Sequence, residues 1–384
     1  MRILLVGNYI PDRQQSMQRF AEVMGNGLKE AGQDVTILRP PVIFGAIPVL
    51  PRVVGKWLGY IDKFFIFPLL LRRAARHCDV VHVCDHSNAM YTRYLQDRPN
   101  VVTCHDTLAI RSALGEFTRN PTRGPGRKFQ QLITNGLRRA QQIVCVSETT
   151  RGDAATIIKC PLGRLSLVYN GFNYPYYPMI REEAEARLRA IGLQPATPYL
   201  LHVGNNSWYK NRMSVLRIFS HLSQYESSKK QSLILVGPPC DFEMKQFIRE
   251  QKLEHRIRNL TNINNEDLCA FYSIADALLF PSLEEGFGWP IIEAQACGCP
   301  VITSNRRAMA EIAGEAALFI DPEDPESAAA SIARRWSELA ELRSIGLRNV
   351  RRFSTPQMID GYLKAYQVVR QEFVDHSLDL QGKA

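Results

Sequence analysis

Short apolar runs alternate with amphipathic stretches along the chain. Six such runs lie in the first half, at residues 2–7, 34–38, 80–83, 100–104, 142–147 and 165–170. They are rich in β-branched residues and end at Gly, Asp, Asn or charged residues, whereas residues 17–31 are amphipathic with a helical period. Continuous apolar runs separated by helical segments are typical of a parallel sheet built from βα units. The first half therefore predicts a Rossmann-like domain.

The alternation restarts after a segment rich in Pro and Tyr, residues 170–181. Six further runs follow, at residues 199–204, 232–237, 258–263, 277–280, 300–303 and 316–320. A restart of this kind after prolines marks a domain boundary. We predict a first domain over residues 1–175 and a second Rossmann-like domain over 195–356. The amphipathic tail, about 357–384, is expected to form a C-terminal helix that packs back on the first domain.

Composition agrees with two globular domains. The chain has 384 residues, which suits two domains of roughly 150–200 residues each. The opening "MRILLVGNYIPD" lacks the basic start and long apolar stretch of a secretory signal, so a cytoplasmic protein is expected. There is no C-x-x-C pair among the cysteines, and we expect them to be reduced.

The net charge of +9 is distributed unevenly. Residues 1–175 carry 23 Lys and Arg against 12 Asp and Glu, while residues 176–384 carry 24 against 26. A one-sided positive excess favours an anionic partner, which can be nucleic acid, a phosphorylated substrate or an anionic membrane surface. A solvated basic surface without a partner is the alternative.

Residues 280–305, "FPSLEEGFGWPIIEAQACGCPVITSN", combine acids with bare backbone. The segment predicts a helix that begins near Pro290 and ends near Gly298. Gly286 and Gly288 lie just before it, where backbone N–H groups can approach an anion such as a phosphate. The carboxylates of Glu285 and Glu293 can accept hydrogen bonds from hydroxyl groups. A sugar nucleotide offers both groups, whereas two surface acids favoured by the helix dipole are the structural alternative.

The string from Pro281 to Val301 resembles the E-x7-E signature of glycosyltransferase family 4. The resemblance implies a bacterial-type group 1 enzyme, which is retaining and has the GT-B fold, two Rossmann-like β/α/β domains facing each other across a cleft. It implies transfer of a hexosyl group from a UDP- or GDP-sugar to a glycan or lipid-linked acceptor, in surface polysaccharide or glycolipid assembly. Glu285 would hold sugar hydroxyls and Glu293 the ribose, beside a donor loop formed by Gly286, Phe287 and Gly288.

Residues 200–212, "LLHVGNNSWYKNR", resemble the family's strand, glycine and cationic stretch that holds the donor diphosphate. Gly204 and Lys210 match this pattern. Many members have Arg immediately before the Lys, where this chain has Tyr209. Whether Arg212 replaces the missing cation is open.

The first half resembles the family more loosely. In residues 101–109, "VVTCHDTLA", His105 and Asp106 match a strand end whose imidazole faces the donor sugar in relatives. Ser147 and Asn170 match positions that line the cleft, with a helix cap and a tight turn as the structural alternatives. Relatives often have Gly-Gly after the first strand, whereas this chain has Gly7 alone. Acceptor contacts there are therefore expected to use side chains, with Gln15 and Ser16 as candidates.

Several motifs are absent. The chain has no D-x-D and no H-E-x-x-H, and His82 and His86 lie on a strand and its exit and not on one helical face. We expect no metal and no cofactor. The alternatives are a sugar-nucleotide epimerase of the same fold, an NAD-dependent oxidoreductase and a nucleic-acid-binding protein. The oxidoreductase lacks its G-x-G-x-x-G fingerprint, and the basic residues are not interleaved with an aromatic platform, so no nucleic-acid partner is expected.

Residues 56–76, "KWLGYIDKFFIFPLLLRRAAR", mix aromatic and basic residues. The eight apolar residues 64–71 are too few to span a bilayer. Aromatic and basic residues together suit a surface that rests on an anionic leaflet, whereas a core helix with a charged exit is the alternative. We predict peripheral contact of the first domain with the inner face of the membrane.

Overall fold

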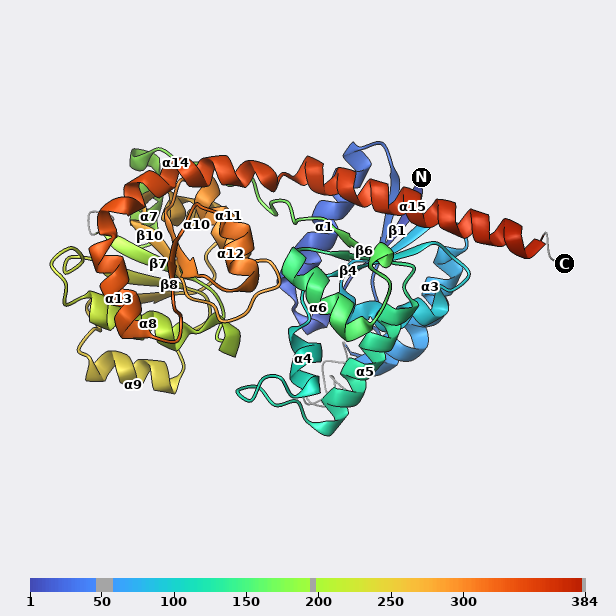
Figure 1. The fold of residues 1–384 in the computed structure, drawn as a ribbon, viewed down its shortest axis with the longest axis horizontal. Helices are drawn as coiled ribbons and strands as arrows, with labels where there is room; N and C mark the ends of the chain where they lie inside the picture. The colour runs from blue at the N-terminus through green and yellow to red at the C-terminus, as the bar shows by residue number, and fades with distance from the viewer. Residues whose placement is uncertain (46–57, 194–197, 382–384) are drawn as a thin grey trace. The chain divides into compact units, whose positions relative to one another are not determined.

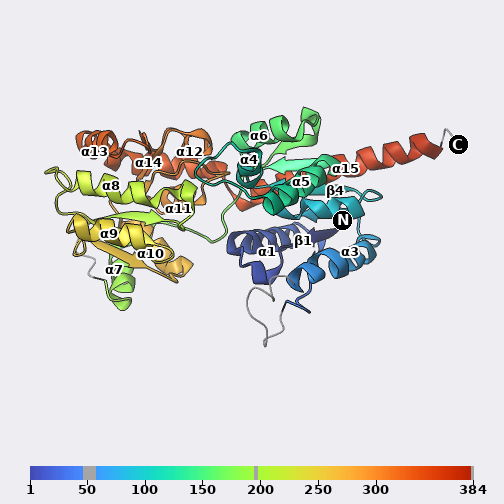
Figure 2. The ribbon, with the colours of Figure 1, turned by 90° about the horizontal axis from the view of Figure 1, so that it is seen from below.

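The computed structural model describes residues 1–45, 58–193 and 198–381 (Figure 1). By its contacts the chain divides into two compact units. Unit 1 comprises Met1–Asn173 and Thr355–Ala384, and unit 2 comprises Tyr174–Ser354. Each unit holds one sheet of six parallel strands with helices packed on both faces (Figures 1 and 2). All twelve predicted strands are confirmed, with ends that shift by no more than three residues.

The sheet of unit 1 has the order β2-β1-β3-β4-β5-β6. Its strands are β1 (Arg2–Val6), β2 (Asp34–Leu38), β3 (Val80–Val83), β4 (Asn100–Cys104), β5 (Gln142–Cys145) and β6 (Leu165–Leu167). In register, Ile3 of β1 lies between Val35 and Val80 of its neighbours. Because all strands run the same way, their carboxyl ends meet at one edge, where ligands bind in open α/β sheets.

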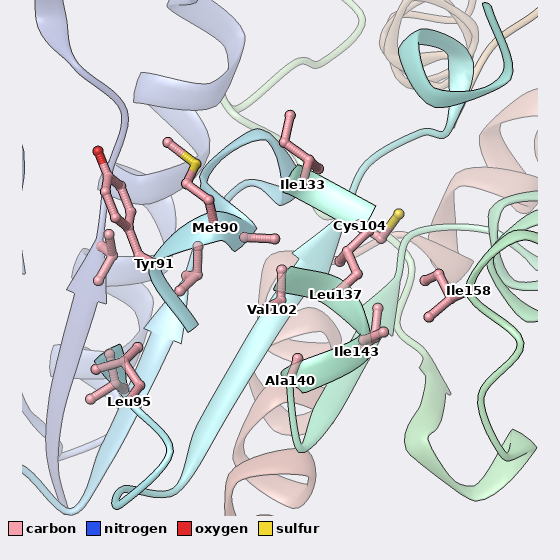
Figure 3. Close-up of a cluster of buried hydrophobic side chains, with 14 of the residues drawn as sticks. Met90, Tyr91, Leu95, Val102, Cys104, Ile133, Leu137, Ala140, Ile143 and Ile158 are labelled. Carbon is pink, nitrogen blue, oxygen red and sulfur yellow. The ribbon is translucent and has the colours of Figure 1, made fainter. Parts of the chain in front are cut away.

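One face of this sheet forms the core shown in Figure 3. It packs against α3 (Phe67–Ala75), α5 (Gly124–Arg139), α6 (Glu148–Ile158) and a 3₁₀ segment, His86–Tyr94. A side chain at Gly136 of α5 would place its Cβ 2.1 Å from the carbonyl oxygen of Ala89. The backbone of α5 therefore lies directly on the 3₁₀ segment, an approach that only glycine permits.

The opposite face carries α1 (Gln15–Glu30) and the C-terminal helix α15 (Thr355–Gln381). Tyr366 of α15 hydrogen-bonds His82 Nδ1 at 2.7 Å, and Tyr362 hydrogen-bonds Thr103 at 2.8 Å. His82 Nε2 lies 2.7 Å from the Thr103 hydroxyl, so the four buried side chains form one network. Polar groups buried together in this way fix the position of α15 on unit 1.

The sheet of unit 2 has the order β12-β11-β10-β7-β8-β9, which is the doubly wound Rossmann order. Its strands are β7 (Tyr199–Val203), β8 (Ser232–Val236), β9 (Ile257–Leu260), β10 (Ala277–Phe280), β11 (Val301–Ser304) and β12 (Leu318–Ile320). Apolar residues of the strands alternate between the two faces, and both faces are covered by helices, which explains the continuous apolar runs.

One face of this sheet packs against α8 (Arg212–Leu222), α9 (Phe242–Glu250) and α13 (Pro325–Arg334). The remaining helices are α7 (Arg181–Ala190), α10 (Asn265–Ile274), α11 (Trp289–Ala296), α12 (Arg307–Ala313) and α14 (Leu339–Asn349). Helix α7 packs on α10 and belongs to unit 2, although the sequence placed the second domain at 195–356. Among the described residues, no helix combines the length and apolarity that a membrane crossing needs.

Candidate functional site

The loop between β10 and α11 carries the glycines and acids of the sequence motif. Gly288 immediately precedes α11 with φ of 98°, a left-handed conformation that favours glycine. Phe287 is buried, and its ring packs edge-to-face on Phe353 at 5.7 Å. Any contact between Phe287 and a ligand would therefore use its backbone. Helix α11 begins as predicted, with Pro290 in its first turn.

Glu285, in this loop, forms an ion pair with Lys210. Lys210 Nζ lies 2.7 Å from Glu285 Oε1, and the two side chains are only 14% and 9% exposed. The ammonium also faces the rings of Phe280 at 5.0 Å and Tyr209 at 5.6 Å. Burial opposes the charged form of Lys210, but its pKa is nevertheless raised, chiefly because Glu285 is so close. The structure thus brings together two residues that are 75 positions apart.

Glu293, in the second turn of α11, has a neutral partner. The hydroxyl of Tyr272, a fully buried residue of α10, donates to Glu293 Oε2 at 3.1 Å. Burial, and then the nearby Glu293 charge, raise the pKa of Tyr272, so its phenol remains a protonated donor. The charge of Glu293 also contributes to the raised pKa of Lys210, after the larger effects of Glu285.

The loop that carries Lys210 is held from three sides. A Cβ at Gly237, just after β8, would lie 2.0 Å from the carbonyl oxygen of Gly204. Asn211, with φ of 54°, donates from its side chain to the carbonyls of Pro281 and Pro322 at 3.2 and 3.0 Å. The carbonyl of Tyr209 accepts a 2.7 Å hydrogen bond from Leu283 N. These contacts hold Lys210 next to the loop between β10 and α11, which carries Glu285.

Arg212, the first residue of α8, is 3% exposed. Its guanidinium donates to the side chain of Asn206 and, at 2.9 Å, to the carbonyl of Pro238. Burial lowers the pKa of this group. In the described contacts Arg212 therefore joins the exit loops of β7 and β8, and it pairs with neither glutamate.

In unit 1, His105 follows β4 at the carboxyl edge of the sheet. The residue is buried, its Nε2 lies 2.9 Å from the carbonyl of Cys84, and its ring packs edge-to-face on Phe20 at 4.6 Å. Burial lowers the pKa of His105 and outweighs the opposing charge of Asp85, so the imidazole is neutral. Since a carbonyl can only accept, Nε2 carries the proton.

The other candidates of unit 1 lie at the same edge of the sheet. Asp106 lies two residues before α4 (Leu108–Leu114), and its Oδ1 accepts a hydrogen bond from Leu108 N, the first residue of that helix, at 2.9 Å. Ser147 is fully buried and caps α6 by accepting from Thr150 N at 3.0 Å. These geometries favour structural roles for both residues.

The last three candidates differ in exposure. Gln15 and Ser16 are exposed and are the first two residues of α1. Asn170, after β6, is 1% exposed, and its side-chain amide has no hydrogen-bond partner among the described residues. A buried amide of this kind is either hydrated or available to a ligand.

Sequence reasoning missed several residues around these sites. Tyr272 has the spacing of a core residue of α10, and nothing in the sequence indicates its contact with Glu293. Asn211 carries a possible signal, because asparagine tolerates a left-handed conformation. In unit 1, Asp85 accepts hydrogen bonds from Asn8 at 2.5 Å and from the Ser87 hydroxyl at 2.6 Å.

Within the described ranges no group of three or more His, Cys, Asp or Glu side chains is arranged to hold a metal ion.

The segment predicted to contact a membrane is described from residue 58, so Lys56 and Trp57 lie outside the described residues. Phe67 was grouped with the other aromatic residues of a membrane-facing segment, with a core helix as the alternative; it is fully buried in the core. Phe65 and Leu69 are 72% and 70% exposed, and Leu70 is 41% exposed. Together with three exposed basic residues, Arg72, Arg73 and Arg76, they form what we call the α3 surface.

Two protein-family models match the chain. The model described as Glycosyl transferases group 1 matches residues 184–345, and the model described as Glycosyltransferase Family 4 matches residues 17–174. O-antigen chain mannosyltransferase B of Escherichia coli is 29% identical over 63% of this chain and 65% of its own length. The chain spans about half to two thirds of the length of the first three curated relatives that it matches.

Solved structures share the fold. Sucrose-phosphate synthase of Thermosynechococcus elongatus superimposes with a TM-score of 0.73 and 21% identity, over 98% of this chain and all of that protein. Anabaena Alr3699/HepE, in complex with UDP and glucose, gives a TM-score of 0.73 and 16% identity over 96% of this chain and all of that protein. The chain thus has the two-domain α/β architecture of the GT-B fold.

Proposed function

Because the chain belongs to the group 1, family 4 glycosyltransferases, we propose that it transfers a hexosyl group from a nucleoside-diphosphate sugar to an acceptor with retention of configuration. The observation that carries the proposal is the buried 2.7 Å ion pair of Lys210 and Glu285, with Glu293 in the second turn of α11, the helix that follows the Glu285 loop. A cation for phosphate and two carboxylates for hydroxyls are what a nucleotide sugar requires.

In this proposal each group of unit 2 has a separate task. Lys210 and the N-terminus of α11 after Gly288 stabilise the negative charge that develops on the departing diphosphate. Glu285 accepts hydrogen bonds from the hydroxyls of the transferred sugar, and Glu293 accepts them from the ribose. Arg212 contributes by holding the exit loop of β7 in place, since its guanidinium already binds Asn206 and Pro238. No step requires a metal ion.

In unit 1 we propose His105 as the residue that contacts the transferred sugar. A neutral imidazole with a proton on Nε2 leaves Nδ1 as the nitrogen able to accept a hydrogen bond from a sugar hydroxyl. Gln15, Ser16 and Asn170 remain candidates for acceptor recognition. The similarity to an O-antigen mannosyltransferase supports an acceptor in surface polysaccharide assembly.

The nucleotide is tested by calorimetry of the full chain with UDP, GDP and ADP. We expect UDP or GDP to bind and ADP not to bind, since the complex of Anabaena Alr3699/HepE holds UDP and the E. coli relative transfers mannose, for which GDP is a natural carrier. Lys210→Ala should weaken binding of the nucleotide by about tenfold or more, because it removes a charge-assisted contact to phosphate. A wild-type chain that binds none of the three nucleotides, but binds NAD or RNA, would refute the proposal.

We further propose that the α3 surface contacts an anionic membrane and so brings unit 1 to a lipid-linked acceptor. Exposed Phe65, Leu69 and Leu70 beside Arg72 and Arg73 combine apolar insertion with attraction to anionic lipid. Residues 119–128, which run from a loop into the first turns of α5, add further exposed basic residues in the same unit.

Sedimentation with vesicles of phosphatidylcholine and phosphatidylglycerol tests this proposal. We expect binding at low salt that weakens at high salt and is lost when Phe65, Leu69 and Leu70 are changed to Ser. Phe242→Ser is the matched control, because Phe242 is 76% exposed but lies in unit 2. Equal sedimentation of the triple variant and the wild type would remove the α3 surface from consideration.

A further inference from the structure

The two glutamates of the E-x7-E motif have electrostatically different partners. Glu285 is paired with a cation, Lys210, at 2.7 Å. Glu293 accepts a hydrogen bond from a neutral hydroxyl, that of Tyr272, at 3.1 Å. Glu285 therefore competes with any anionic ligand for Lys210, whereas the hydrogen bond to Glu293 involves no cation that an anion would draw away.

The ion pair lies in surroundings that make this competition strong. Both side chains are largely buried, and the ammonium faces the rings of Phe280 and Tyr209. Charges in such a site interact more strongly than charges in water, because little solvent screens them. A phosphate that approaches Lys210 meets the carboxylate of Glu285 in the same small volume, and the repulsion between the two anions opposes its binding.

An intact donor and a spent donor differ in how they meet this repulsion. The sugar of a nucleotide sugar brings hydroxyl groups that can donate to Glu285 and replace the contact it loses with Lys210. A nucleoside diphosphate has no such hydroxyls, and its terminal phosphate carries an extra ionisable oxygen that is esterified in the donor. The product is thus left with an uncompensated carboxylate beside a more negative phosphate.

We infer that Glu285, through its ion pair with Lys210, is a specificity-determining residue that makes the site select the intact nucleotide sugar over the nucleoside diphosphate product. This inference rests on the proposed function. It assigns to Glu285 a role in product release in addition to the contact with sugar hydroxyls. Transfer of the hexosyl group removes the hydroxyls that balanced Glu285, so Glu285 returns to Lys210 as the diphosphate leaves.

Calorimetry with two nucleotide pairs, UDP with UDP-glucose and GDP with GDP-mannose, tests the inference. Glu285→Gln is expected to bind the diphosphate about tenfold more tightly than the wild type, while it binds the nucleotide sugar no more tightly. The preference for the nucleotide sugar should therefore fall by at least about tenfold. Glu293→Gln is the matched control, since the same isosteric change there should weaken both ligands by a similar factor and leave the preference unchanged.

Glu285→Gln also leaves a buried ammonium without its carboxylate, so its melting temperature should fall and should be restored by the diphosphate. If this variant does not fold, Glu285→Asp serves instead, because it keeps the charge but withdraws it from Lys210, and an intermediate loss of preference is expected. An unchanged or increased preference in either folded variant would overturn the inference. A wild type that binds none of the four nucleotides would refute the proposed function itself.

Discussion

Replacing Tyr272 with phenylalanine removes one hydroxyl group and leaves the ring that packs between α10 and its neighbours. The hydroxyl donates to Glu293 Oε2 at 3.1 Å, and Tyr272 is fully buried. A hydrogen bond to a charged group contributes about 1.5–3 kcal/mol. Because Glu293 is 6% exposed, few water molecules can replace the lost donor.

We expect two consequences. The chain should unfold with a free energy lower by about 1.5–3 kcal/mol, and its affinity for UDP or GDP should fall by about tenfold, because Glu293 is no longer oriented toward the ribose. The wild type should also prefer the ribonucleotide to its 2′-deoxy and 3′-deoxy analogues, and Tyr272→Phe should lose most of this preference. A mere loss of stability would not change that ratio.

Tyr199→Phe is the matched control. Tyr199 is also buried in unit 2, and its hydroxyl donates to the carbonyl of Phe271 at 2.8 Å, next to Tyr272 in sequence. This variant should lose about 1 kcal/mol of stability and keep both the affinity and the ribose preference. Calorimetry with the ribonucleotide and its 2′-deoxy and 3′-deoxy analogues measures the ribose preference, and urea denaturation measures the free energy of unfolding. A Tyr272→Phe protein with the ribose preference of the wild type would refute the assignment of Glu293 to the ribose.

Three further predictions concern the metal, the buried histidines and the core. Transfer should continue in excess EDTA, and a loss of activity that Mg²⁺ or Mn²⁺ restores would contradict the metal-independent mechanism. Burial lowers the pKa values of His82 in unit 1 and His202 in unit 2 to about 3, so each histidine is neutral in the folded chain and takes up a proton on unfolding below about pH 6.5. The free energy of unfolding should not depend on these histidines above that pH, and below it each histidine should lower it by about 1.4 kcal/mol per pH unit. Equal urea midpoints at pH 6.5 and 5.5 would count against this prediction. Gly136→Ala should destabilise unit 1 by more than about 2 kcal/mol in urea denaturation, because the new Cβ would meet the Ala89 carbonyl oxygen at 2.1 Å. An unchanged urea midpoint would show that α5 can move away from the 3₁₀ segment.

The sequence predicts the strands well because both faces of each sheet are covered by helices. Strands in that position are apolar throughout, so β3 and β4 stand out from the amphipathic segments between them and their predicted bounds match the structure. The amphipathic tail likewise predicts that α15 packs on unit 1. The residues that fix it there were not predictable, since His82 and Tyr366 are separated by 284 positions and meet only in the folded chain.

The helical period explains why Phe67 is buried although Phe65 and the three arginines of the α3 surface are exposed. The sequence grouped the aromatic residues of 56–76 together, but residues four apart share one side of a helix. Phe67, Leu71 and Ala75 face the core in this way, whereas Phe65 and Leu69 face outward. The composition of the segment therefore indicates an exposed surface of aromatic and basic residues. The helical period shows which of the aromatic residues lie on that surface.

The position before Lys210 connects the departure from the family pattern with the electrostatics of the site. Sequences that resemble this one often have Arg there, but Tyr209 supplies a ring 5.6 Å from the ammonium and a carbonyl that accepts from Leu283 N. These contacts of Tyr209 hold the loop together with Arg212, whose guanidinium binds Asn206 and the carbonyl of Pro238. Among the contacts of the described residues, Lys210 is the cation that pairs with Glu285, so its attraction for a diphosphate is partly offset by that carboxylate. Under these conditions the hydroxyls of the sugar and ribose must contribute much of the donor's affinity, which is why the partners of the two glutamates decide how the site treats donor and product.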